Sequence, residues 1–145
     1  MLGPFQITLH ARPVNPPQSA TAEVQGRPIR SLIVPPESTG TAFPTTFEAT
    51  LAALEALPRM FIEPDGSFVW VSSHDEPKPW QLDGALYDRN GHMLYVDLKG
   101  SCPPEAFDRI LQSLGWPATA VMVQLVREAV FTDEETFRRY SAKEE

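Results

Sequence analysis

Asp83 and Asp97 are the two residues of this chain best placed to do chemistry together. They lie on two segments of alternating apolar and polar residues, 80–88 and 92–99, which are typical of the strands of a β-hairpin. A three-residue loop over 89–91 collects the apolar side chains on one face and sets the two carboxylates opposite each other. This register predicts the pairs Leu86 with Leu94, Leu82 with Leu98, and Asp83 with Asp97.

Two carboxylates that face each other repel, so this arrangement requires a bound cation, a shared proton or a nearby positive charge. A cation or a shared proton would make the pair a metal or acid/base site, as in a small hydrolase or a metal-assisted enzyme. Lys99 lies diagonally across the hairpin and supplies a positive charge. Solvated carboxylates neutralised by Lys99 are therefore the simpler interpretation.

Cys102 and His74 are weaker candidates for catalysis. Cys102 immediately precedes Pro103-Pro104-Glu105, where a helix is expected to begin, and a helix N-terminus favours a thiolate. A reactive thiol would need a base such as His74 or His92, and no spacing supports either pairing, so a buried, unreactive cysteine is the simpler interpretation. His74 lies in the polar segment 72–79, but a catalytic triad is assembled from separated segments rather than from consecutive residues. That segment is predicted to be a solvated linker.

Composition excludes several function classes. The chain has 145 residues, a net charge of −7 and one cysteine, which suits one domain over 1–145 without an internal disulfide or a multi-cysteine zinc site. An acidic chain is poorly suited to non-specific binding of nucleic acid or anionic membranes. The glycines form no phosphate-binding motif and the histidines never fall at the HExxH spacing of zinc hydrolases, so we expect no metal and no cofactor. No long apolar run or signal sequence is evident, which predicts a soluble, cytoplasmic protein.

The clearest structural pattern is a hairpin over 59–71. Its turn, Pro64-Asp65-Gly66, suits a type I turn followed by a bulge, and it sets Ile62 opposite Phe68. Counting outward, both faces of this ribbon are apolar, so the second face must be covered by another segment or by a partner. The residues predicted to form a binding surface are Met60, Phe61, Val69 and Trp70.

The remaining segments predict an alternation of strands and helices. A half-buried strand is expected over 5–12, followed by a proline-rich arm over 13–44 with one edge strand over 29–34. Thr45 and Glu48 form a capping box for a helix over 45–57, and a second helix is expected from Pro103 to Gly115. Residues 118–131 fit a strand or a helix, and strand is favoured because a new capping box begins at Thr132. The tail over 141–145 is expected to fray.

These elements predict an α+β two-layer sandwich, with an antiparallel meander of about four to six strands and two or three helices packed mainly on one face. The preferred function is a non-catalytic interaction or binding protein that acts through an apolar sheet face, with a protein partner or with a second copy as a homodimer. The alternative is the small hydrolase or metal-assisted enzyme that would use Asp83 and Asp97.

Overall fold

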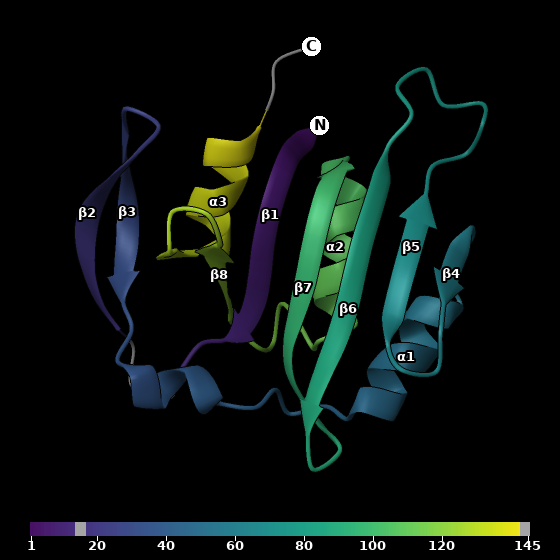
Figure 1. Cartoon of the computed structure of the whole chain (residues 1–145), viewed down its shortest axis with the longest axis horizontal. Helices are drawn as coiled ribbons and strands as arrows, with labels where there is room; N and C mark the ends of the chain where they lie inside the picture. Colours follow the sequence, from purple (N-terminus) through teal and green to yellow (C-terminus); the bar gives the residue numbers. More distant parts are fainter. Residues whose placement is uncertain (14–16, 143–145) are drawn as a thin grey trace.

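The computed structural model describes residues 1–13 and 17–142, which form a nine-stranded antiparallel sheet with three α-helices (Figure 1). The strand order is β2-β3-β9-β8-β1-β7-β6-β5-β4. The elements are β1 Leu2–Ala11, β2 Gln18–Val24, β3 Arg27–Ile33, the 3-10 helix η1 Pro36–Gly40, α1 Phe47–Glu55, β4 Met60–Ile62, β5 Ser67–Val71, β6 Gln81–Arg89, β7 His92–Cys102, α2 Pro104–Gln112, β8 Val121–Leu125, β9 Val130–Asp133 and α3 Glu134–Ser141.

The predicted count of four to six strands is wrong, although helices over an antiparallel sheet agree broadly with the expected α+β sandwich. One missing strand is β2, which pairs with β3 through a turn at Gln25-Gly26 within the segment expected to be a mostly irregular arm. Both turn residues have positive φ, 51° and 76°, as a type I′ hairpin turn requires. Residues 14–16 of the predicted arm lie outside the described residues.

The ambiguous segment 118–131 supplies two strands, as the weak preference for strand over helix suggested. β8 and the start of β9 form a hairpin, with Leu125 paired to Val130. The helix that follows begins one residue later than predicted, because Asp133 and not Thr132 is the N-cap and its carboxylate accepts a hydrogen bond from the Thr136 amide at 2.6 Å. Ser141, expected to belong to a frayed tail, is buried at the end of α3, and residues 143–145 lie outside the described residues.

All three α-helices pack against the same face of the sheet. Phe107 of α2 and Phe137 of α3 both contact the ring of Phe5 on β1, at centroid distances of 6.3 and 5.5 Å. Phe47 of α1 lies next to Leu86 of β6, on the same face. Figure 1 shows α2 behind β6 and β7. The core therefore lies between the helices and one face, and no α-helix of residues 1–13 and 17–142 lies on the opposite face.

The strand β1 is central, between β7 and β8, which explains its burial. Its pairing with β8 begins at Ile7 and its pairing with β7 runs from Leu2 to His10. The strand predicted over 5–12 is confirmed and begins three residues earlier.

The first predicted hairpin is confirmed in register. Met60 pairs with Trp70, Phe61 with Val69 and Ile62 with Phe68. The Gly66 amide donates to the Glu63 carbonyl at 2.9 Å, and Gly66 has the positive φ, 94°, that its turn position requires.

The register predicted for the second hairpin is wrong by two residues. Asn90 and Gly91, with φ of 53° and 87°, form a two-residue type I′ turn, and an irregularity after Tyr87 then shifts the remaining pairs. A shift by two residues preserves which side chains share a face. The observed pairs are Leu86 with Val96, Gly84 with Leu98, Asp83 with Lys99, and Ala85 with Asp97.

The first two helices lie close to their predicted positions. Thr46, not Thr45, caps α1 by accepting from the Ala49 amide at 3.0 Å, so the predicted capping box with Glu48 is wrong by one residue. After α2, the Trp116 amide donates to the Leu111 carbonyl and Gly115 has a φ of 101°. This is the Schellman geometry in which glycine ends a helix, as predicted.

Candidate functional site

One face of the sheet is covered by no α-helix of the described residues, and we call it the helix-free face. Alternation along each strand decides which side chains lie on it. On the four strands at its centre, β6, β7, β1 and β8, these are Asp83, Ala85, Tyr87, Tyr95, Asp97, Lys99, Gln6, Thr8, His10, Met122 and Gln124. The face combines aromatic, carboxylate, ammonium and amide groups.

Four aromatic side chains form a continuous line across this face, here called the aromatic row. Tyr87 stacks on Tyr95 with centroids 4.5 Å apart, and Tyr95 stacks on His10 at 5.6 Å. His10 then meets Phe131 edge-on at 5.4 Å. The row crosses from β6 to β9, and its Tyr87 end is 40% exposed. Aromatic groups with polar atoms are enriched where proteins bind other proteins.

His10 is the buried centre of the aromatic row. Its Nε2 lies 2.7 Å from the hydroxyl oxygen of Thr8, which donates in turn to Gln124 Oε1 at 3.2 Å. Its Nδ1 has no hydrogen-bond partner among the described residues. Burial lowers the pKa of His10 from 6.5 to about 4, because the charged form would lose its hydration. The ring is therefore neutral at pH 7 and acts as an aromatic surface.

Asp97 interacts with Tyr87 at the exposed end of the aromatic row. Its negative charge, together with a hydrogen bond to the phenol, raises the pKa of Tyr87 above its usual value. The pKa of Tyr95 is also raised, first by burial and second by the charge of Asp97. Both phenols therefore stay protonated, and Asp97 acts as a hydrogen-bond acceptor that fixes Tyr87.

A polar groove of about 460 Å³ lies beside the aromatic row on the same face. Both predicted carboxylates line it, but they do not oppose each other, because Asp83 pairs with Lys99 and Asp97 pairs with Ala85. Asp83 also accepts a hydrogen bond from the Gln81 amide group at 3.0 Å. The direct opposition of two carboxylates, which motivated the acid/base and metal hypotheses, is therefore wrong.

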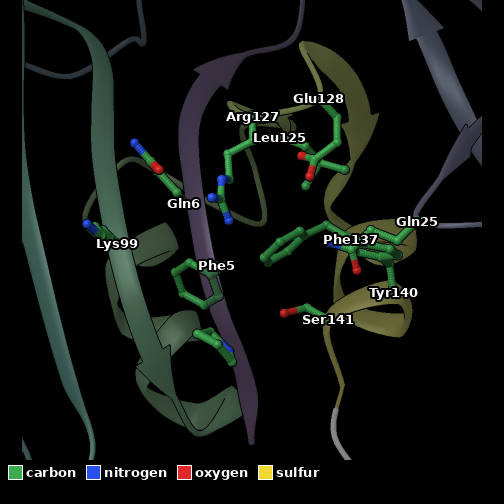
Figure 2. Close-up of a pocket in the computed structure, with 11 residues that line it drawn as sticks. Phe5, Gln6, Gln25, Lys99, Leu125, Arg127, Glu128, Phe137, Tyr140 and Ser141 are labelled. Carbon is green, nitrogen blue, oxygen red and sulfur yellow. The ribbon is translucent and has the colours of Figure 1, made fainter.

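A second cavity of about 320 Å³ opens where β8 ends and β1 continues (Figure 2). Figure 2 shows Phe5 at β1 and the ring of Phe137 between β1 and α3, with Arg127 next to β1. Gln6 and Lys99 line both this cavity and the polar groove. The two cavities therefore share part of their lining.

Cys102 is placed where a thiol cannot act as a nucleophile. It is fully buried at the end of β7, and burial is the main cause that raises its pKa to about 12. The helix N-terminus that follows does not compensate for this loss of hydration. The thiolate that a catalytic cysteine requires is therefore negligible near neutral pH.

We expect Cys102 to be inert in the folded protein. A water-soluble disulfide reagent that reports released thiolate should react negligibly with the native chain at mildly alkaline pH, and with one thiol per chain in denaturant. A fast, complete reaction of the native protein would contradict the burial of this side chain.

The two histidines that were considered as catalytic partners lie apart from the groove. His74 is exposed in the segment between β5 and β6 and lies 3.3 Å from Asp75. His92 is exposed at the start of β7, next to the hairpin turn. Neither lines either of the two cavities on this part of the sheet.

The four residues predicted to form a binding surface divide between the two faces. Met60 and Trp70 point towards the helices, and the Trp70 indole donates to the Pro58 carbonyl at 2.9 Å. Phe61 and Val69 point away from them, and Phe61 is 65% exposed. The exposed apolar part of this hairpin therefore lies on the helix-free face.

Within residues 1–13 and 17–142, no three His, Cys, Asp or Glu side chains gather closely enough to hold a metal ion. None of the helices in these residues has the length and apolar character needed to cross a bilayer. Comparison of the chain with known protein families, with curated proteins and with solved structures gives no match. The function must therefore be argued from the geometry.

Sequence reasoning missed the aromatic row and its central His10. The alternation in 5–12 already placed Gln6, Thr8 and His10 on one side of a strand. The missing information was the neighbour on each side, because Tyr95 and Phe131 reach His10 from strands far away in the sequence.

Proposed function

We propose that this protein is a non-catalytic binding protein that holds a protein partner on its helix-free face. The observation that carries the proposal is the aromatic row, a continuous line of contacts between rings from four strands on the helix-free face. Tyrosine supplies a large rigid surface and a polar group, so it contributes strongly to protein interfaces.

The arrangement around the aromatic row supports binding in a second way. The exposed side chain of Phe61 adds apolar surface at one edge of the face, and the polar groove adds hydrogen-bonding groups next to the rings. An interface typically combines an aromatic centre with a polar surround that fixes orientation. We therefore place the centre of the interface at Tyr87 and Tyr95.

The enzymatic alternative depended on two directly opposed carboxylates, and the structure does not contain that arrangement. Asp83 lies opposite Lys99 in the hairpin and accepts a hydrogen bond from the Gln81 side chain, and Asp97 accepts a hydrogen bond from Tyr87. Each carboxylate thus has a partner that explains its presence without a substrate. Asp83 and Asp97 therefore give no structural reason to propose an enzyme that uses paired carboxylates.

Substitution of Tyr87 tests the proposal. The tagged full-length chain is used to isolate a partner from its native cells, and the affinity is then measured with both purified components. Tyr87→Lys removes an exposed ring and leaves an ammonium beside Asp97, so the fold should persist while the dissociation constant rises by about tenfold or more.

The control is Gln112→Lys, which adds the same charge at an exposed position on α2, on the other side of the sheet. It should bind as the wild type does. A partner that binds Tyr87→Lys and the wild type equally would show that the interface lies elsewhere. Failure to isolate any saturable partner would count against the proposal as a whole.

A further inference from the structure

The strand β2 forms one edge of the sheet, and Glu23 and the preceding Pro17 are its only features that limit pairing with a further strand. Among the described residues it pairs only with β3, and Figure 1 shows it at the left margin with no segment beyond it. Its sequence, Gln-Ser-Ala-Thr-Ala-Glu-Val, has no proline, no lysine and no bulge, and most of its side chains are small and exposed. Proteins normally shield a sheet edge with such features because an open edge pairs with another strand.

The opposite edge of the same sheet is protected. The strand β4 has only three residues, against seven in β2. A short strand limits the number of main-chain groups that a further strand could bind. The two edges therefore differ, and only β2 offers a full row of main-chain groups.

The turn between β2 and β3 decides which main-chain groups of β2 point outward. In a two-residue turn the flanking residues Val24 and Arg27 are hydrogen-bonded to each other. Hydrogen-bonded pairs alternate along an antiparallel ladder, so Ala22 and Ala20 also bond to β3. The amide and carbonyl groups of the intervening residues Ser19, Thr21 and Glu23 therefore point away from the sheet.

These three outward residues are symmetric about the middle of the strand. Thr21 is the central residue of Gln18–Val24, with Ser19 two residues before it and Glu23 two residues after it. A two-fold axis through Thr21 thus pairs Ser19 with Glu23 of the second copy and Thr21 with Thr21 of the second copy. Every outward group meets another outward group, giving about six main-chain hydrogen bonds.

The side chains also tolerate this pairing. Glu23 faces a serine hydroxyl rather than another carboxylate, so no like charges are opposed, and a cross-strand threonine pair is favourable. Ala20 lies opposite Ala22 of the second copy, and at the ends of the strands Gln18 lies opposite Val24.

We infer that two copies of this chain form a symmetric dimer by antiparallel pairing of their β2 strands, with the two-fold axis at Thr21. Such an interface is isologous, since the same surface is used by both copies. It extends each nine-stranded sheet into that of the second copy and leaves the aromatic row uncovered. The inference is independent of the proposed partner site, because the two surfaces lie at different places on the sheet.

Sedimentation equilibrium of the full chain over a wide concentration range tests the dimer. The wild type should show a monomer–dimer equilibrium. Thr21→Pro should raise the dimer dissociation constant by about tenfold or more, since proline removes an outward amide that the monomer does not use. Gln112→Lys, on α2, should dimerise as the wild type does.

A charge exchange tests the register. Thr21→Lys sets two ammonium groups opposite each other and should be monomeric, whereas its equimolar mixture with Thr21→Glu should form heterodimers in excess of either homodimer, as native mass spectrometry would show. A wild type that stays monomeric at all concentrations would overturn the inference. A dimer that persists in Thr21→Pro and Thr21→Lys but dissociates in Tyr87→Lys would also overturn it, by placing the dimer contact on the aromatic row.

Discussion

Replacing Gly100 by alanine should destabilise the protein by about 4 kcal/mol or more, a large part of the stability of an ordinary domain. Gly100 lies in β7 between β1 and β6, with a φ of 134° that side chains rarely adopt. A Cβ there would be only 2.1 Å from the Gln81 carbonyl oxygen. Because that atom belongs to the main chain of a paired strand, neither the clash nor the φ strain can be relieved by a side-chain rotation.

Gly26→Ala is the matched control for this experiment. Gly26 also has a positive φ, 76°, but a Cβ at this turn position would meet nothing within 4 Å. It should therefore show only the cost of the backbone conformation, about 1 kcal/mol. Chemical denaturation of both variants gives the comparison, and equal losses of unfolding free energy would show that β6 and β7 do not approach closely at Gly100.

The turns of this fold could be predicted from sequence where one pattern decided the result. Pro64-Asp65-Gly66 gave the correct register because each residue suits its turn position and a single loop length fits. The turn at Asn90-Gly91 was predicted wrongly, because a type I′ turn followed by a regular ladder would distribute the apolar residues over both faces. In the structure a bulge follows the type I′ turn and returns the apolar residues to one face. A bulge leaves no distinctive residue pattern at Tyr87, so the pairing of Asp83 could not be obtained.

The strand β2 illustrates a different limit. Its residues alternate only weakly in polarity, since an exposed edge strand has no core face to fill and its small polar residues resemble a loop. Proline content favoured an irregular arm, but Pro28 of β3 pairs with Glu23 at a position that does not bond to β2. A proline can therefore lie in a paired strand at a position where its missing amide would not have bonded to that neighbouring strand.

The candidate site was predictable only in part for a related reason. Alternation correctly placed Tyr87, Tyr95 and Asp97 on one face, because that property is local to each strand. Their contacts with His10 depend on β1 lying next to β7, a pairing between distant segments. Binding surfaces built across a sheet are thus encoded in strand order, which sequence patterns do not specify.

Acidification should destabilise this protein through His10, and the free energy of unfolding should fall by about 3 kcal/mol from this group alone. The pKa of His10 is lowered from 6.5 to about 4 by burial, so between these values the unfolded chain binds a proton that the folded chain does not. The stabilisation is therefore complete above pH 6.5 and is lost as the pH falls towards 4.

His10→Phe isolates this contribution from the carboxylates that also titrate in acid. The variant keeps a ring between Tyr95 and Phe131, and removes the ionisable nitrogens, including the unpartnered Nδ1. Its stability relative to the wild type should improve by about 3 kcal/mol between pH 7 and pH 4, as denaturation at each pH would measure. His74→Gln, at a histidine whose side chain is 93% exposed, should leave the pH profile unchanged. If His10→Phe and the wild type lose stability in parallel on acidification, the pKa of His10 is the same in the folded and the unfolded chain, and burial does not lower it.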